Sequence, residues 1–315
     1  MPETRLDLAR IRAARQVIDP VFLDTPLYRC EALEPVLGCA VSIKLETANP
    51  VRSFKGRGTE VVADGLAGAV VCASAGNLGQ ALAWSGRRRG LDVTVVASRH
   101  ATPAKLERIR ALGARLELVD GDHELARERA VAIARRDGIR LVEDSLDLET
   151  CEGAATIGLE LADAGTAFDA VLIALGGGAM ATGVGHVLRA LAPGTEVLCV
   201  QPAGAPAMTR SWHARRVITT GPTHTIADGV AGRRPIPEVL ADLLLVADDA
   251  VLVSEASIVA GVRLLFEHAG LVAEPSAALG IAAVLEAPDR FAGRHVVTIV
   301  CGGNVDPAAF RGWLA

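Results

Sequence analysis

The amino-acid sequence predicts an α/β fold built on parallel sheets. Short runs rich in β-branched residues alternate with amphipathic stretches along nearly the whole chain. Within each run consecutive residues are apolar, which is typical of strands that helices cover on both faces. Half of the 315 residues are hydrophobic, so the chain can bury a large core and is not disordered.

The elements follow in a regular order. Helix start and stop signals lie between the apolar runs: an N-cap residue or proline opens each helical stretch, and glycine closes most of them. The predicted strands are residues 69–72, 92–97, 115–119, 140–142, 170–175, 196–200 and 296–300. The predicted helices run from the cap Asn77 to before Gly90, from Thr102-Pro103 to Gly113, from His123 to Asp137, from the cap Ser254 toward Gly270, and onward from Pro275.

Two α/β units are expected. Four strands and three helices between Ala69 and Val142 form one compact unit, and a second unit begins near Ala170. We predict a small domain of residues 69–144 inserted into a large domain made of residues 1–68 and 145–315. Because ligands bind at the carboxyl ends of parallel strands, a cleft between the two units is the expected site.

Composition excludes several classes of protein. The net charge is −5 and aromatic residues make up 3%, so a nucleic-acid partner is not expected. The N-terminus has no apolar signal segment, and glycines interrupt the longest uncharged stretch, residues 170–188. We expect a cytoplasmic protein with no membrane contact. None of the six cysteines forms a Cys-x-x-Cys pair, which predicts reduced, buried thiols.

Two short motifs in the first half of the chain could carry chemistry. Lys55 lies in Ser53-Phe54-Lys55-Gly56-Arg57-Gly58, and it is either a surface lysine in a turn or a desolvated amine that forms a Schiff base. The segment Ser74-Ala75-Gly76-Asn77 joins a strand to a helix start, where free N–H groups suit an anion. Taken alone, a plain helix cap at Asn77 is the better interpretation of this second motif.

Two further motifs follow strands in the second half. Gly176-Gly177-Gly178-Ala179-Met180 resembles a phosphate cradle, because small residues let backbone amides wrap around an anion. It matches neither nucleotide-binding glycine pattern, and three glycines in a row exceed what a tight turn requires. Cys301-Gly302-Gly303-Asn304 ends the last strand and by itself is only a strand terminus.

The order of these four motifs resembles the fold-type II pyridoxal-phosphate enzymes, and within them the serine/threonine dehydratases. The resemblance covers nearly the whole chain and implies a tryptophan synthase β-like architecture, with two parallel-sheet domains and pyridoxal 5′-phosphate between them. Further matching segments are Thr25-Pro26-Leu27, residues 43–46, 102–105, 156–160, 227–229, 274–277 and 304–306.

The resemblance also implies a role for each motif. Lys55 binds the cofactor and moves the Cα proton, Phe54 packs near the pyridine ring, and Asn77 bonds the ring's 3′-oxygen. Cys301 faces the pyridine nitrogen. The substrate carboxylate lies against Ser74, Ala75, Gly76 and Asn77, and the phosphate against Gly176, Gly177, Gly178, Ala179 and Met180.

The sequence departs from the family pattern at several positions. Val51-Arg52 replaces the usual Thr-Gly, and the added Arg52 cation either contacts substrate or points to solvent. Ala179 replaces a fourth glycine, which is tolerable if its φ is negative. Gln201 and Ala207 stand where some relatives have carboxylates for a cation, so no metal is expected.

The implied activity is the conversion of L-threonine or L-serine to a 2-oxo acid and ammonia by a homodimer. The alternatives are a dehydratase for a bulkier or acidic β-hydroxy amino acid, a threonine synthase, an amino-acid racemase, or a scaffold that has lost catalysis. Racemisation needs an acid/base on each face of the substrate, and in racemases of this family a serine supplies the second one. This chain has Ala75 there, which favours elimination.

Overall fold

The computed structural model describes residues 3–315 and contains two mostly parallel sheets, which confirms the α/β class. The strands are β1 Leu27–Arg29, β2 Ala40–Leu45, β3 Ala69–Ala73, β4 Asp92–Ser98, β5 Arg115–Val119, β6 Arg140–Val142, β7 Ala170–Ala174, β8 Glu196–Pro202, β9 Asp249–Val253 and β10 His295–Val300. The α-helices are α1 Leu8–Val17, α2 Glu34–Leu37, α3 Lys55–Ala63, α4 Asn77–Arg89, α5 Pro103–Ala111, α6 His123–Asp137, α7 Leu148–Ala162, α8 Ala179–Leu191, α9 Ala207–Ala214, α10 Pro237–Val246, α11 Glu255–Ala269, α12 Leu279–Glu286, α13 Pro288–Phe291 and α14 Pro307–Leu314.

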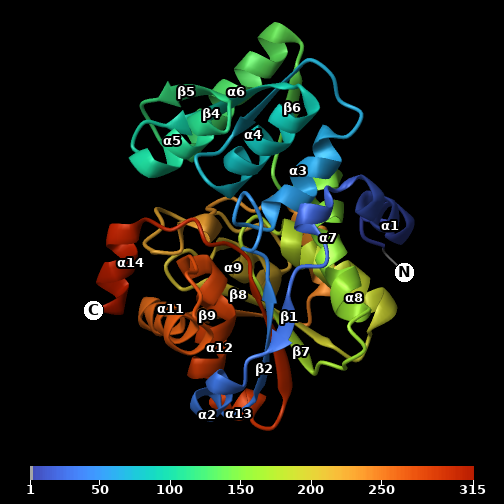
Figure 1. Cartoon of the computed structure of the whole chain (residues 1–315), viewed down its shortest axis with the longest axis vertical. Coiled ribbons are helices and arrows are strands. Elements are labelled where there is room, and N and C mark those ends of the chain that lie inside the picture. Colours follow the sequence, from blue (N-terminus) through green and yellow to red (C-terminus); the bar gives the residue numbers. More distant parts are fainter. Residues whose placement is uncertain (1–2) are drawn as a thin grey trace.

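The smaller sheet has the order β5-β4-β3-β6, and all its pairs are parallel. Successive residues of β3 face opposite sides, as the period of a strand requires. Val70 and Cys72 pack in one cluster with Leu82 of α4, whereas Val71 packs in another with Ile133 of α6. Figure 1 shows this sheet with α4, α5 and α6 at one end of the molecule.

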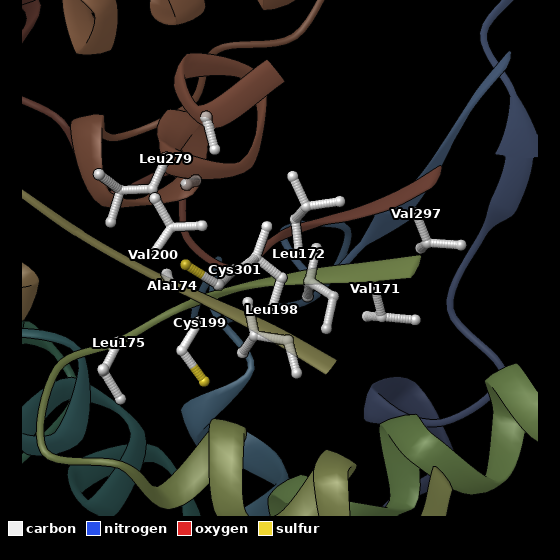
Figure 2. Packing of buried hydrophobic residues seen from close by; sticks show 14 of the residues in the cluster. Val171, Leu172, Ala174, Leu175, Leu198, Cys199, Val200, Leu279, Val297 and Cys301 are labelled. Atoms are coloured by element: carbon white, nitrogen blue, oxygen red, sulfur yellow. The ribbon is translucent and has the colours of Figure 1, made fainter. Parts of the chain in front are cut away.

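The larger sheet has the order β1-β2-β10-β7-β8-β9 and is parallel except for the edge strand β1. Its central strands are buried on both faces, and Figure 2 shows side chains such as Leu172, Leu198 and Val200 packed there. The seven predicted strands are all present, but β1, β2 and β9 were not predicted. Their sequences mix polar and apolar residues, and they become strands through pairing: β1 with β2, β2 with β10, and β9 with β8.

Helices α3 and α7 cross closely near the junction of the two sheets (Figure 1). A side chain at Gly153 would lie 2.5 Å from the Cα atom of Gly58, so the crossing requires glycine. Arg57 of α3 is fully buried and bonds Glu46, Glu160 and Thr156. This packing holds the first turn of α3, and with it Lys55, in a fixed place.

Two helix starts differ from the prediction. Asn77 is the first residue of α4 and does not cap it; the N-cap is Gly76, because the Asn77 amide bonds Glu274 instead. Pro275 opens a 3₁₀ turn, Pro275–Ala278, before α12 begins. Ser254 caps α11 as expected, and all six cysteines are free and buried. The domain limits at 68/69 and 144/145 stay a prediction.

In residues 3–315 no helix combines the length and the apolar character needed to cross a membrane.

Candidate active site

Lys55 lies at the start of α3, beside the end of β10. The N–H of Phe54 donates to the carbonyl of Cys301 at 3.1 Å, and Ser53 pairs with Gly302 as an isolated bridge. The Lys55 ammonium lies 4.6 Å from the centre of the Phe54 ring. It also contacts both carboxylate oxygens of Asp144, at 2.6 and 2.8 Å. The first and fourth motifs of the sequence therefore meet at one place.

The glycine loop joins β7 to α8. Gly178 has φ +110°, and a side chain there would lie 2.4 Å from Val239, so only glycine fits. Among residues 3–315 no acceptor is bonded to the N–H groups of Gly176, Gly177 and Gly178. Ala179 lies in the helix and is not at positive φ. Three unused N–H groups at a helix N-terminus are suited to binding an anion such as a phosphate.

Two consecutive residues after β6 connect Lys55 with the glycine loop. Asp144 is the ion-pair partner of Lys55, and Ser145 accepts a hydrogen bond at 3.1 Å from the N–H of Ala179. Ser145 is buried, and its φ of +66° is unusual for a residue other than glycine. The amine and the glycine loop therefore contact adjacent residues, whose Cα atoms are about 3.8 Å apart.

The sequence reasoning missed Asp144 and Ser145. A signal for them existed, because both follow a predicted parallel strand at its carboxyl end, where ligand-binding residues gather. The dipeptide was overlooked because it carries no glycine-rich motif.

The loop between β3 and α4 remains accessible. Ser74, Ala75, Gly76 and Asn77 are all only partly buried. The N–H of Gly76 donates to the Ser74 hydroxyl at 3.2 Å, which leaves the Ser74 O–H free to donate elsewhere. The loop can therefore offer donors to a small anion at the start of α4.

Asn77 belongs to a buried polar cluster that joins this loop to the larger sheet. Its side-chain N–H donates to Glu274 at 2.9 Å, and its oxygen accepts from Asn304 at 2.8 Å. Glu274 also accepts from Ser276 at 3.0 Å. No cation contacts Glu274 among residues 3–315, and burial raises the pKa of its carboxyl.

Cys301 directly follows β10 inside the apolar core, where Figure 2 shows its side chain among the buried residues. Burial, assisted by the nearby Glu274, raises the pKa of the thiol, so it stays neutral at physiological pH. A neutral thiol is no nucleophile, but it can take part in a hydrogen bond.

Arg52 precedes Lys55 by three residues and is exposed. Its φ is +52°, a backbone region that disfavours residues with side chains, and its carbonyl accepts from the N–H of Gly303 at 2.9 Å. No carboxylate pairs with Arg52 among residues 3–315. Burial, together with the nearby charge of Arg52, lowers the pKa of Arg108.

The two candidate positions for a cation differ from a carboxylate site. Gln201 is buried and its side-chain oxygen accepts from the N–H of Thr209 at 3.0 Å, and Ala207 begins α9. Within residues 3–315 no group of three or more His, Cys, Asp or Glu side chains is placed to hold a metal ion.

The chain is similar to known proteins over almost its whole length. The family model described as "Pyridoxal-phosphate dependent enzyme" matches residues 18–302. Phenylserine dehydratase of Ralstonia pickettii is 32% identical over 96% of this chain and 95% of that protein. L-threonine ammonia-lyase of Thermotoga maritima is 30% identical over 96% of this chain and 76% of that protein.

Solved structures agree with these matches. The crystal structure of a threonine deaminase from T.th. superimposes with a TM-score of 0.90 at 31% identity, covering 96% of this chain and 99% of that one. Maize serine racemase superimposes with a TM-score of 0.88 at 27% identity, covering 97% and 96%.

Proposed function

The chain belongs to the pyridoxal-phosphate dependent enzymes, and on that premise we propose that it is a dehydratase that converts L-threonine or L-serine to a 2-oxo acid and ammonia. The observation that carries this proposal is the Asp144-Ser145 dipeptide, which brings the Lys55 amine next to the glycine loop. An amine beside an anion cradle matches the two ends of a phosphorylated aldehyde cofactor.

The residues present fit pyridoxal 5′-phosphate. The unused N–H groups of Gly176, Gly177 and Gly178, together with the N–H groups of Ala179 and Met180 that follow them, would hold the phosphate, and Phe54 would pack against the ring. Asn77 would donate to the 3′-oxygen, and the neutral Cys301 thiol would face the ring nitrogen. When bound, the cofactor supplies an electron sink for the charge that develops at the substrate Cα atom.

The other steps fall to side chains of this chain. Ser74, Ala75, Gly76 and Asn77 would hold the substrate carboxylate at the start of α4. Lys55 Nζ would remove the Cα proton, the Cβ–O bond would break, and the hydroxyl would leave as water after gaining a proton, for which the Lys55 ammonium is the donor that this chain supplies. The enamine product would take up one water and release ammonia, which leaves the 2-oxo acid. Asp144 would stabilise the ammonium that Lys55 becomes after taking the proton.

A dehydratase for a bulkier side chain is the second candidate. The 32% identity to phenylserine dehydratase over nearly both chains favours it as much as the relative named L-threonine ammonia-lyase favours the first. A racemase is less well supported, because Ala75 has no proton to give to the far face of the substrate. Homodimer formation and a cytoplasmic location stay predictions.

The test of the activity is a coupled assay of ammonia and 2-oxo acid. The panel would contain L-threonine, L-serine, a phenylserine and an acidic β-hydroxy amino acid, with chiral chromatography of the remaining substrate. We expect 2-oxo acid and ammonia with little D-amino acid. Inversion at Cα as fast as ammonia release would show that another group serves the far face and that a racemase is the better proposal.

The test of the site is reduction of the holoenzyme with borohydride, followed by peptide mass mapping. We expect the cofactor on Lys55, and we expect Lys55→Ala to lower turnover by at least about 10⁴-fold, because it removes both the covalent link and the proton acceptor. Attachment to another lysine, such as Lys44 or Lys105, would overturn the assignment.

A further inference from the structure

We infer that Arg108 is a positioning residue, which acts through Asn304 to fix the orientation of the Asn77 side-chain amide toward the cofactor. This inference rests on the proposed function, in which Asn77 donates to the ring oxygen. Arg108 lies on α5 of the smaller unit, and Asn304 follows β10 of the larger sheet. Arg108 was not among the residues that the sequence motifs singled out, whereas Asn304 ends the fourth motif.

The first link fixes the amide of Asn304. A guanidinium can only donate hydrogen bonds, so the Asn304 atom that contacts Nη1 of Arg108 must be the oxygen Oδ1. On its other side, Nδ2 of Asn304 lies 2.8 Å from the carbonyl oxygen of Val51, which can only accept. Two independent partners therefore give the same orientation, and a rotated Asn304 amide would meet a donor with a donor and an acceptor with an acceptor.

The second link transfers this orientation to Asn77. Because Asn304 presents Nδ2, the atom of Asn77 at 2.8 Å from it must be the acceptor Oδ1. Nδ2 of Asn77 then faces the Glu274 carboxylate at 2.9 Å. Hydrogen bonds thus run in one direction from Arg108 through Asn304 and Asn77 to Glu274. Asn77 keeps one N–H free, which is the donor that an anionic ring oxygen requires.

Burial makes this order difficult to reverse. Asn304 and Glu274 are each only 7% exposed, so water is not at hand to compensate a rotated amide. Arg108 pairs with no carboxylate among residues 3–315, so its guanidinium is not held elsewhere. Because Arg108 lies on α5 beside the smaller sheet and Asn304 follows β10 of the larger sheet, their hydrogen bond links the two parts of the molecule.

A purely structural role for Arg108 makes a different prediction. If Arg108 only held α5 against the larger sheet, any variant that keeps this contact would bind cofactor normally. The variant Asn304→Asp separates the two cases, because the aspartate still accepts from Arg108 but has no N–H to offer Asn77. Asn77 would then turn its Nδ2 toward the aspartate and lose the fixed direction of its free donor.

The experiment uses the full chain freed of cofactor and then titrated with pyridoxal 5′-phosphate. For Asn304→Asp we expect a lower melting temperature without cofactor, because the aspartate loses the bond to the Val51 carbonyl, a dissociation constant raised about ten- to hundredfold, and a shifted visible absorbance of the bound cofactor. Arg108→Met should raise the dissociation constant by a smaller factor. Arg110→Met, an exposed arginine on the same helix, is the matched control and should bind as the wild type does.

Each other result decides the question. Wild-type affinity and absorbance in Asn304→Asp would overturn the inference. Equal losses of melting temperature and affinity in Asn304→Asp, with normal absorbance, would also overturn it and leave Arg108 a structural role. Asn77→Ala distinguishes the underlying proposal: if this variant binds cofactor normally, Asn77 is no cofactor ligand and both claims fail. If only Asn77→Ala binds weakly, the site stands and the positioning role does not.

Discussion

Two polar clusters in the interior of the molecule differ in how their carboxylates are compensated. The fold cluster consists of Lys44, Glu46, Arg57 and Glu160, and the site cluster of Asn77, Glu274, Ser276 and Asn304. The fold cluster contains two cations and two carboxylates in direct contact. The site cluster contains one carboxylate, that of Glu274. Among residues 3–315 only neutral groups donate hydrogen bonds to this carboxylate.

The pKa values of the buried groups reflect this difference. Burial opposes the charges of Arg57 and Glu160, but their contacts outweigh it: the pKa of Arg57 is raised and that of Glu160 is lowered. In the site cluster burial prevails, and the pKa of Glu274 is raised. The fold cluster, with its charges in mutual contact, therefore holds the helix crossing in place, whereas the site cluster keeps hydrogen-bond donors and a charge available for a ligand.

The largest expected effect comes from removing a cation from the fold cluster. Arg57→Met leaves Glu46 and Glu160 buried with only Lys44 to oppose them. We expect the free energy of unfolding to fall by about 3–5 kcal/mol, because a buried carboxylate without a partner is costly. Urea unfolding of the cofactor-free protein measures this.

The matched control removes a partly exposed ion pair near the opposite edge of the larger sheet. Arg189→Met breaks the pair with Asp248, whose side chains are 38% and 32% exposed. This change should cost less than about 1 kcal/mol. Equal effects of the two variants would contradict the special role of the buried cluster.

The two buried carboxylates should respond to pH with opposite signs. Because the pKa of Glu160 is lowered in the folded chain, its carboxylate contributes stability above the ordinary value of 4.5, and this contribution is lost as pH falls through the folded-state pKa. Glu160→Gln should therefore destabilise the protein by about 1.5–3 kcal/mol at pH 7, and by less as the pH falls below 4.5.

Glu274 is the opposite case. Because its pKa is raised, its contribution to stability is fully present below 4.5 and is lost as pH rises through the folded-state pKa. In the cofactor-free protein, Glu274→Gln should therefore be more stable than the wild type at pH 7, by about 1 kcal/mol, and equal to it at low pH. Unfolding curves at several pH values test this. A loss of stability at pH 7 would contradict it, because it would show that the surroundings of Glu274 stabilise its ionised carboxylate.

The smallest expected effect concerns Arg52, a cation near the site cluster that pairs with no carboxylate among residues 3–315. Its φ of +52° costs about 1–2 kcal/mol. Glycine would relieve this strain, but its greater freedom in the unfolded chain offsets part of the gain. Arg52→Gly should therefore raise the free energy of unfolding by up to about 1 kcal/mol. If Arg52 contacts substrate, the ratio of kcat/KM for threonine, serine and an acidic β-hydroxy amino acid should also change.

Arg215 supplies the control, since it has the same φ of +52° and ends α9. Arg215→Gly should relieve the same strain and leave the ratio of kcat/KM unchanged. If the two variants differ only in stability, or not at all, Arg52 has no part in substrate choice.

Much of the site could be predicted from the sequence because local signals mark it. Glycine runs after apolar strands indicate anion loops, and a lysine with small neighbours indicates a place where a cofactor can approach. Asp144 and Ser145 follow a predicted strand but have no glycine run beside them. Strand β2 was missed because Ser42 and Lys44 look like surface residues. Lys44 is buried only because Glu160, far along the chain, meets its charge.

By itself the sequence determined the α/β class and most strands and helix ends, and it marked the four motifs that meet near Lys55. These properties depend on hydrophobic periodicity, caps and glycines, which act over a few residues. Which charges are compensated, and which amides have a fixed orientation, depends instead on contacts between residues far apart in the chain. Asn77 looked like a helix cap, but it bonds Glu274 and Asn304, roughly 200 residues away, since a hydrogen bond depends on distance in space and not on distance along the chain.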